Sequence, residues 1–295
     1  MVRRSVICFG ETLWDVFPDK RVPGGAPMNV ALRLRRFGVD VCFLSRVGKD
    51  VDGDGLLDYM QSKSLATCYV QRDTAHPTGR VYVDTTDPNE VRYTIAEDVA
   101  WDYIDVGAFR EEHSIEPDVV IYGSLAARHP VSRHGLLSLL DDAQLNVFDV
   151  NLRPPFDNAE TLQLLLERAD WVKVNEHELA YLTSTPFRAS DVESMAMTLS
   201  ERFQLDAVCV TMGANGVVLL DGGTFYRQRA FAVDVVDTVG CGDAFLGSWV
   251  AAMLNEQSPQ AALERAAAVA AIVAGSEGAN PAFSDADVAA LVGSR

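Results

Sequence analysis

Long hydrophobic runs are missing from this chain of 295 residues. No stretch approaches the roughly 18 consecutive apolar residues that a membrane-spanning helix needs, so we expect no membrane association. Met1 leads directly into a strand-like segment at 5–10, without a separate hydrophobic segment or a small-residue cleavage site. We therefore expect no secretory signal.

Positive charge is also scarce. The chain has 25 Lys and Arg residues against 42 Asp and Glu residues, which gives a net charge of -17. An acidic protein repels phosphate backbones unless it carries a local basic patch. The one dense basic cluster, RLRRFG at 33–38, is interpreted as a solvated helix face. We expect no nucleic-acid partner.

Cysteine is infrequent and scattered. The chain has five cysteines and no C-x-x-C pair, which argues against a disulfide framework. Cys8, Cys42 and Cys209 lie inside apolar runs, so we expect them in the core. This usage favours a cytoplasmic protein.

Several nucleotide and metal motifs are absent. No G-x-x-x-x-G-K-[ST] loop occurs, and no G-x-G-x-x-G follows a strand, which argues against a dinucleotide enzyme. The histidines lack zinc-binding spacing. DVDGDG at 50–55 resembles the start of a calcium loop, but Gln61 stands where a bidentate Glu is needed. We interpret it as an acidic loop before a helix.

The chain does contain short apolar runs with the composition of buried parallel strands, at 5–10, 118–124, 145–150, 170–175 and 206–213. Helical patterns lie between and after them, at 160–169, 192–203, 244–254 and 261–275, the last stopped by Gly275. Strands alternating with helices predict an α/β fold with a mostly parallel sheet.

Polar residues follow each of these runs: Glu11 and Asp15, Ser124, Asp149 with Asn151 and Arg153, Asn175 with Glu178, and Thr211 with Gly213 and Gly216. Ligands of open α/β sheets bind beyond the carboxyl ends of the strands. For any one of these residues an ordinary loop or helix-cap role is the simpler interpretation. Together they predict one crevice.

Residues 66–100 have a different pattern. TCYVQRD, GRVYVDTT and EVRYTIA alternate apolar and polar residues, which is typical of half-exposed antiparallel strands. We expect residues 1–295 to form a single domain, with a small β lid from about 12–30 and 66–100 over the crevice. An exposed lid edge could also pair with a second subunit in a homodimer.

The stretch DTVGCGDAF at 237–245 places small residues before one carboxylate. A helix N-terminus exposes free N–H groups, so Gly240, Cys241 and Gly242 can form a cradle for an anion. Asp243 would be misplaced beside an anion unless it removes a proton from an attacking hydroxyl. The alternative is that Asp243 only caps the helix.

At this point the sequence resembles the PfkB, or ribokinase-like, family of carbohydrate kinases over nearly its whole length. GGAPMNVALRLRRFGVDVCFLSRVGKDVDGDGL is similar to the N-terminal signature of the family, and DTVGCGDAFLGSWVAAML to its more specific C-terminal signature. The resemblance implies a three-layer α/β/α fold with a small β-sheet lid, and ATP with Mg²⁺ as cofactors.

The resemblance also implies roles for individual residues. Asp243 would be the catalytic base, with Gly240, Cys241 and Gly242 as the anion hole. ATP would contact Asn175, Thr211, Gly213 and Gly216, and Glu178 would organise Mg²⁺ through water. The sugar would be held by Asp15, Gly24, Gly25 and Asn29, while Arg153 would reach the sugar or the transferred phosphoryl group.

A monovalent cation such as K⁺ is implied beside the anion hole, at Asp237 and the carbonyl groups of Val239, Val273, Ser276 and Gly278. Ala282 departs from the relatives that offer a serine there. GGAPMN and DVNLRPPF look like fructokinases, so we expect a sugar kinase that converts D-fructose to fructose 6-phosphate. Open alternatives are 2-keto-3-deoxygluconate, ribose or a nucleoside as substrate, or a sugar sensor without catalysis.

Overall fold

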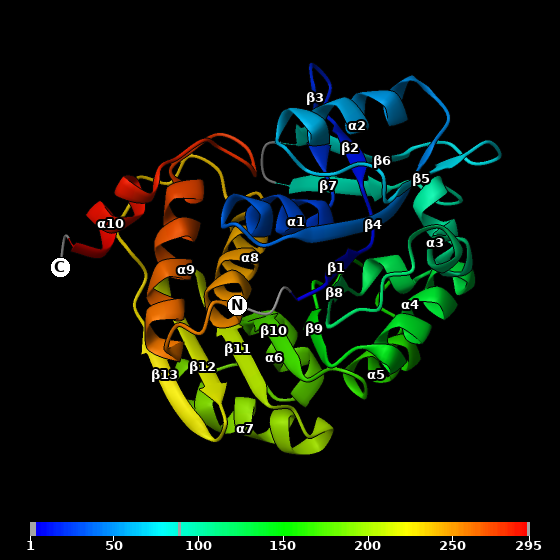
Figure 1. Ribbon diagram of the computed structural model, residues 1–295. Coiled ribbons are helices and arrows are strands. Elements are labelled where there is room, and N and C mark those ends of the chain that lie inside the picture. The colour runs from blue at the N-terminus through cyan, green and yellow to red at the C-terminus, as the bar shows by residue number, and fades with distance from the viewer. Residues whose placement is uncertain (1–3, 88–89, 294–295) are drawn as a thin grey trace.

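A nine-stranded sheet runs through the centre of the computed structural model, which describes residues 4–87 and 90–293 (Figure 1). Residues 88–89 of the predicted lid, and 1–3 and 294–295, lie outside the described residues. The strands follow one another across the sheet as β13 (Thr224–Gln228), β12 (Val217–Asp221), β11 (Ala207–Thr211), β10 (Trp171–Asn175), β9 (Leu145–Asp149), β8 (Val119–Gly123), β1 (Val6–Phe9), β4 (Val41–Gly48) and β5 (Val70–Asp73).

The five predicted apolar strands are β1, β8, β9, β10 and β11, and they lie side by side in this sheet. The pairings among these five strands are parallel, whereas β12 pairs antiparallel with both β11 and β13. Because the carboxyl ends of parallel strands share one edge, the polar residues that follow these strands gather there. The predicted α/β fold with a mostly parallel sheet is confirmed.

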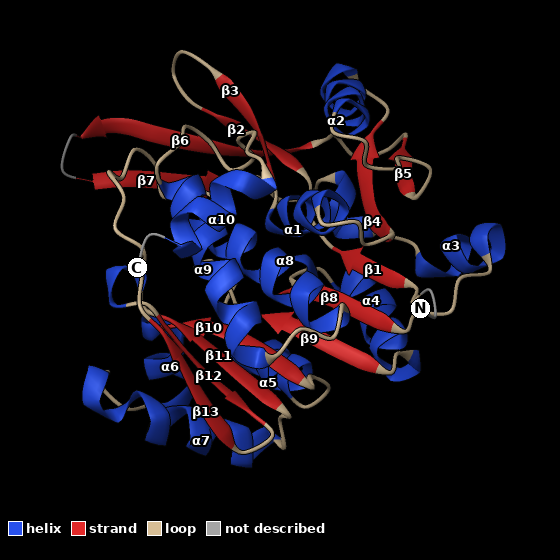
Figure 2. Cartoon of the chain, turned by 60° about the vertical axis from the view of Figure 1, so that its left-hand side comes forward, coloured by secondary structure: helices blue, strands red, loops and turns tan. Residues whose placement is uncertain are grey.

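Helices cover both faces of the sheet (Figures 1 and 2). One apolar cluster joins the sheet to α1 (Ala26–Arg36), α2 (Val51–Ser62), α8 (Cys241–Leu254) and α9 (Pro259–Ala274). The other joins it to α3 (Val106–His113), α4 (Pro130–Asp142), α5 (Ala159–Leu166), α6 (Glu176–Thr183) and α7 (Val192–Phe203). The short α10 (Asp285–Gly293) packs on α9. The predicted helices are present as α5, α7, α8 and α9, and Gly275 is the C-cap of α9.

A second sheet of four strands lies above α1 in Figures 1 and 2. Its order is β3 (Arg21–Gly24), β2 (Leu13–Val16), β6 (Gly79–Asp87) and β7 (Glu90–Ile95). One part of the prediction is wrong: β5, within TCYVQRD, pairs in parallel with β4 at the edge of the large sheet. β5 is partly exposed because it lies at the sheet edge, with Val70 and Asp73 buried and Arg72 exposed, so its mixed composition does not separate it from a lid strand.

Three further expectations concern single elements. Cys8, Cys42 and Cys209 are buried free thiols, as predicted. Arg33 corrects the solvated-face interpretation of RLRRFG, because it is buried in α1 and stacks over the Phe283 ring at 4.8 Å. A long arginine stem can line apolar surface, which charge counting misses. Asp52 lies in the first turn of α2 rather than in a loop.

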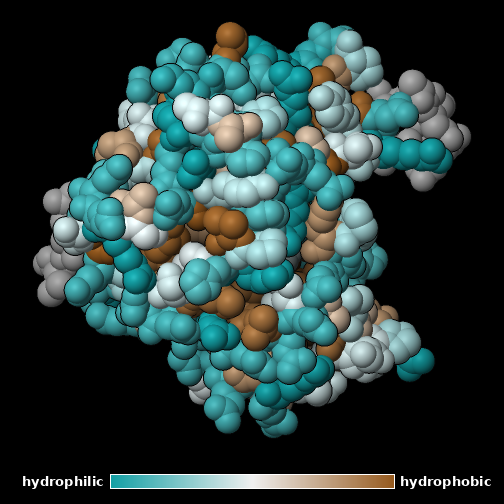
Figure 3. Space-filling view, turned by 90° about the vertical axis from the view of Figure 1, so that its right-hand side faces the viewer, coloured by the Kyte–Doolittle hydropathy of each residue, from teal (hydrophilic) through white to brown (hydrophobic). Residues whose placement is uncertain are grey.

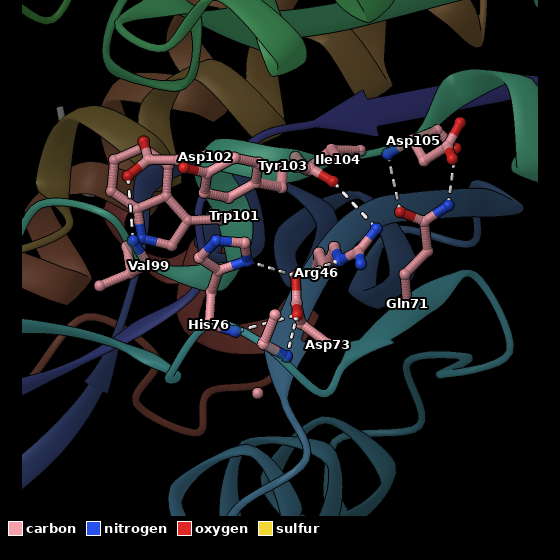
Figure 4. A network of polar contacts seen from close by, with 12 residues as sticks. Arg46, Gln71, Asp73, His76, Val99, Trp101, Asp102, Tyr103, Ile104 and Asp105 are labelled. Atoms are coloured by element: carbon pink, nitrogen blue, oxygen red, sulfur yellow. Dashed lines mark hydrogen bonds and ion pairs between the residues drawn. The ribbon is translucent and has the colours of Figure 1, made fainter.

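A polar network anchors the chain where it enters and leaves the small sheet (Figure 4). Asp73, at the end of β5, forms an ion pair with Arg46 at 2.7 Å and accepts the backbone N–H groups of Ala75 and His76. The His76 ring stacks on Tyr103 with centroids 3.7 Å apart. These contacts tie the segment before β6 to the segment after β7, so the lid has a fixed base.

Arg128 and Asp102 complete that base as a buried ion pair. Their side chains are 6% and 2% exposed, and two N–H groups of Arg128 reach both carboxylate oxygens at 2.7 and 2.8 Å. The guanidinium also donates to the Ala96 carbonyl, where the chain leaves β7, and stacks over Trp101. A buried charge that loses its partner is costly, so each member requires the other.

The side of the molecule that carries β5 and α3 is mostly hydrophilic, with hydrophobic residues gathered near its middle (Figure 3). A cavity of about 350 Å³ lies there, and it contains none of the predicted site residues. Its arginines are already paired, Arg46 with Asp73 and Arg72 with Asp54. Among the helices of the described residues, none is long and apolar enough to cross a membrane.

We expect Arg128→Ala to lower the free energy of unfolding by about 3–5 kcal/mol, because it leaves Asp102 buried without a counter-charge. Urea unfolding followed by circular dichroism measures this. Arg168→Ala is the matched control, since the Arg168–Asp141 pair is 30% and 60% exposed and should contribute about 1 kcal/mol or less. Equal losses in the two variants would contradict the anchoring role of Arg128.

Candidate active site

The stretch at 237–245 folds as the predicted turn into a helix. Gly240 is the N-cap of α8, with a φ of 74° that favours glycine. A Cβ at Gly240 would also lie 2.7 Å from the Cα of Ala279, so only glycine fits. The Cys241 amide donates to the Thr238 carbonyl at 3.3 Å. No described residue accepts the Gly242 amide, which is therefore available to an anion.

Asp243 lies in the first turn of α8 but does not cap it. The helix has no side-chain cap, and the Asp243 carboxylate instead accepts a hydrogen bond of 2.8 Å from the side-chain amide of Asn29 in α1. The pKa of Asp243 is raised to about 6, mainly by burial and also by Asp149, while Asn29, Lys173 and Arg153 act in the opposite direction. The carboxyl group is thus poised to exchange a proton near neutral pH.

Two more acids share this environment. Burial raises the pKa of Asp15, on β2, to about 6 and that of Glu11 to about 7. Asp243 contributes to both increases in pKa, and Arg153 opposes both. The carboxyl group of Glu11 is buried, and its Oε2 has no hydrogen-bond partner among the described residues. Sequence reasoning noted Glu11 after the first strand but assigned it no role.

The two glycines of GGAPMN allow the backbone at 24–25 to lie close to Asp15, Glu11 and Thr12. A Cβ on Gly24 would collide with the Asp15 carboxylate, whose Cγ would be 3.1 Å away. A Cβ on Gly25 would meet the backbone of Glu11 and Thr12. The two glycines thus bring Asp15, Asn29 and Glu11 to one place. Arg153 follows β9 and is coupled electrostatically to Glu11, Asp15 and Asp243, so these predicted residues form one group.

A buried lysine lies behind the anion cradle. Lys173 Nζ is 2.9 Å from Asp149 Oδ1 on the neighbouring strand, and it would be 3.1 Å from a Cβ on Gly242. Burial lowers the pKa of Lys173, but Asp149 and Glu178 outweigh burial and raise it, so its ammonium stays charged. Sequence reasoning missed Lys173. The signal was a charged residue in the middle of the apolar strand WVKVN.

Asn175 and Glu178 form a capping box at the start of α6. The Asn175 side chain accepts the amides of His177 and Glu178, each at 2.9 Å. The buried Glu178 carboxylate accepts the amides of Asn175 at 2.7 Å and Leu152 at 3.0 Å. Burial raises the pKa of Glu178, and Lys173 opposes this. The two residues therefore have a structural role, which N-x-x-E spacing also predicts.

The other predicted nucleotide residues adjoin Asn175. Thr211 pairs with Asn175 across β10 and β11, and Gly213 and Gly216 close a tight turn in which the Met212 amide donates to the Gly216 carbonyl at 2.8 Å. The turn stands beyond the carboxyl end of β11. Asn175, Thr211, Gly213 and Gly216 thus lie together at the carboxyl ends of β10 and β11.

The turns that carry the predicted cation residues contact one another. Asp237 accepts the amides of Val239 at 2.9 Å and Gly278 at 3.3 Å, and its own amide donates to the Ala274 carbonyl. Ser276 donates to the Val273 carbonyl at 3.0 Å. Asp237 therefore joins the turn at 237–239 to the turn at 276–278, beside Gly240.

Mg²⁺ would have few direct protein ligands. Among the described residues, no group of three or more His, Cys, Asp or Glu side chains is placed to hold a metal ion. The buried Asp149 Oδ2 has no hydrogen-bond partner among them, and Glu178 lies near the same lysine. These carboxylates fit an ion that keeps its water and binds phosphate oxygens.

Comparison with known proteins adds independent observations. A family model described as pfkB family carbohydrate kinase matches residues 2–286. A fructokinase from Klebsiella pneumoniae is 29% identical over 268 residues, which cover 85% of this chain and 84% of that protein.

Two solved structures have the same fold. A Vibrio cholerae fructokinase double mutant, bound to fructose, ADP and potassium, superimposes with a TM-score of 0.85 at 23% identity, covering 98% of both chains. Aminoimidazole riboside kinase from Salmonella enterica, bound to aminoimidazole riboside and an ATP analogue, gives 0.80 at 23% identity, covering 98% of this chain and all of that chain (100%).

We expect Asp243→Asn to raise the melting temperature at about pH 8. The folded protein binds a proton at this carboxyl more tightly than the unfolded chain does, so its contribution to stability declines as pH rises from about 4 to about 6. The amide of Asn does not ionise, so the variant avoids the cost of a buried charge at pH 8. The increase in melting temperature should become smaller towards pH 5, where Asp243 is protonated in the folded protein. Scanning calorimetry of the wild type and the variant at pH 8 and pH 5 measures the melting temperatures.

Asp287→Asn is the control of opposite sign. Hydrogen bonds from Ser284 hold the pKa of Asp287 below its usual value, so its ionised form stabilises the fold above about pH 4. This variant should melt lower at pH 8. A lower midpoint for Asp243→Asn at the same pH would contradict the buried-charge description of the site.

Proposed function

The chain belongs to the pfkB family of carbohydrate kinases, and on that premise we propose that it phosphorylates D-fructose at the 6-hydroxyl. The observation that carries the proposal is the placement of Asp243, half-buried at the start of α8, hydrogen-bonded to Asn29 and not used as a helix cap. A carboxylate in that place is suited to removing a proton beside an anion-binding helix N-terminus. The fructokinase from Klebsiella pneumoniae supports the choice of sugar.

In the proposed reaction, Asp243 accepts the proton of the sugar hydroxyl as the hydroxyl oxygen attacks the γ-phosphorus of ATP. The new O–P bond forms as the bond to the β,γ-bridging oxygen breaks, and ADP leaves. The Gly242 amide, with those of Gly240 and Cys241 as the turn permits, stabilises the charge on the transferred group. Lys173 adds positive charge behind this cradle.

The sugar would lie between the crevice and the small sheet. Asp15 and Asn29 would hold its hydroxyl groups, Gly24 and Gly25 would let it approach the backbone, and Arg153 would reach the sugar or the phosphoryl group. The Asn29–Asp243 contact supports this, because it puts a sugar contact and the base within one hydrogen bond. Closure of the lid would exclude water and prevent ATP hydrolysis.

ATP would lie along the rim formed by Asn175, Thr211, Gly213 and Gly216. Mg²⁺, held through water near Glu178, would neutralise phosphate charge. A monovalent cation would bind at Asp237 and the carbonyl groups of Val239, Val273, Ser276 and Gly278. The potassium ion of the Vibrio cholerae fructokinase structure supports a cation of this kind.

A homodimer through the small sheet remains part of the proposal. Tyr82 on β6 and Tyr93 on β7 are 47% and 61% exposed, which suits residues that a second subunit covers.

One rival activity has a specific observation in its favour. The similarity to aminoimidazole riboside kinase, with a TM-score of 0.80, shows that this fold also accommodates a ribosyl substrate. A riboside or ribose could present a primary hydroxyl to Asp243 in the same way. A family member could also keep the fold as a sugar sensor, but a sensor does not require a poised base.

We expect Asp243→Asn to lower turnover by about 10³-fold or more, because the amide cannot accept the hydroxyl proton. The affinity for ATP, measured by calorimetry, should change little, since the predicted ATP residues lie elsewhere on the sheet edge. Asp141→Asn, on the exposed side of α4, is the control and should keep wild-type turnover. Wild-type turnover in Asp243→Asn would rule out the base assignment.

We expect kcat/KM to be highest for D-fructose in an ADP-release assay that compares fructose, ribose, 2-keto-3-deoxygluconate and a nucleoside. The measurement includes Mg²⁺ and K⁺ throughout. A higher value for another member of the panel would transfer the assignment to that substrate. ADP release at the buffer rate with every compound would favour the sensor.

A further inference from the structure

Asn280 contacts the predicted site without belonging to any motif. It lies between α9 and α10, and its side-chain N–H donates to Asn29 Oδ1 at 2.7 Å. Asn29 in turn donates from its own N–H to Asp243 Oδ2 at 2.8 Å. The two hydrogen bonds form a chain from the loop after α9, through α1, to the carboxylate at the start of α8.

The chemistry of these three groups fixes their orientation. An ionised carboxylate only accepts hydrogen bonds, so Asn29 must turn its N–H group towards Asp243 and its oxygen away. That oxygen then needs a donor, because Asn29 is buried. Asn280 supplies it. If Asn29 rotated by half a turn, its oxygen would face the carboxylate, and its N–H group would face that of Asn280.

Asn280 is itself held from a third helix. Its side chain is in hydrogen-bond contact with the Tyr59 hydroxyl on α2, and its backbone carbonyl accepts Lys63 Nζ at 3.5 Å. Asn280 is therefore linked to α2 as well as to Asn29 in α1. A substrate hydroxyl that displaces one N–H of Asn29 would leave the bond between Asn29 and Asn280 intact.

We propose that Asn280 is a positioning residue for the catalytic base, which acts by locking the side-chain amide of Asn29 with its N–H group towards Asp243. The proposal rests on the proposed role of Asp243. Asn280 would not touch substrate; it would determine whether Asp243 keeps its one hydrogen-bond donor and its direction. A buried carboxylate without a donor binds its proton more tightly.

The charges around Asp243 determine how its pKa would change if the hydrogen bond from Asn29 were lost. The groups that act on it from the surrounding elements are Glu11, Asp15, Arg33, Asp149, Arg153, Lys173 and Cys241. Burial and the acids favour the protonated form, and Arg153, Lys173 and Arg33 are the opposing charges that remain. Without the Asn29 donor the pKa of Asp243 rises. As pH falls, the carboxylate is then protonated, and stops acting as a base, at a higher pH than in the wild type.

The test is Asn280→Leu, which removes the donor and adds no charge. We expect the acid limb of kcat/KM against pH to move up by about one pH unit, the size of one hydrogen bond to a charged group. At pH values below the limb, kcat/KM should therefore be about tenfold lower than in the wild type, and it should recover towards the wild-type value above the limb. Asn280→Ser, which is too short to reach Asn29, should behave in the same way if the leucine variant folds poorly.

Asn255→Leu is the matched control, because Asn255 is exposed at the opposite end of α8. It should leave the pH profile unchanged. In an Asn29→Ala background, Asn280→Leu should cause no further shift, because its effect passes through Asn29. A uniform loss of rate at every pH, or additive effects of the two substitutions, would overturn the proposal.

The pKa of Asp243, measured by carbon NMR on aspartate-labelled protein, separates this proposal from the proposed function. An upward shift in Asn280→Leu supports positioning even if no sugar is phosphorylated. An unchanged Asp243 pKa overturns it, even if Asp243→Asn abolishes turnover and confirms the base.

Discussion

The structure around the site depends on one constraint: the Asp243 carboxyl group is partly buried and lies beside other acidic side chains. Burying an amide here would cost less free energy than burying Asp243, which is retained with the neutral donor Asn29 and the positive charges of Arg153, Lys173 and Arg33 near it. The glycines before it serve this arrangement. They leave the Gly242 amide uncovered and let the loop at Ala279 pack against the turn. Stability is given up here for a proton acceptor near neutral pH.

The large sheet supplies the electrostatic support for this group. β9 and β10 pair in parallel so that Lys173 meets Asp149, and the capping box of α6 holds Glu178 beside them. Because all of the central strands end at one edge, residues distant in sequence act on a single carboxylate. The small sheet, fixed at its base by Arg128 and Asp73, brings Asp15 to the same place.

Much of this could be predicted from the sequence where the signal was local. Apolar runs gave five neighbouring strands, and glycine spacing gave the turn before Asp243. β5 was misplaced because an edge strand of the large sheet and a lid strand both mix apolar and polar residues. Arg33 was misread because composition does not reveal a buried stem. Lys173 and Asn280 were missed because their roles depend on partners far away in the chain, Asp149 and Asn29, which only the fold brings within hydrogen-bond distance.

The account is tested most directly by a crystal structure with D-fructose and a non-hydrolysable ATP analogue. It predicts the Asp243 carboxylate within about 2.6–3.2 Å of the sugar 6-hydroxyl, in line with the γ-phosphorus. A hydroxyl that instead contacts Glu11 or Asp15, with Asp243 turned towards the core, would contradict the assignment of the base.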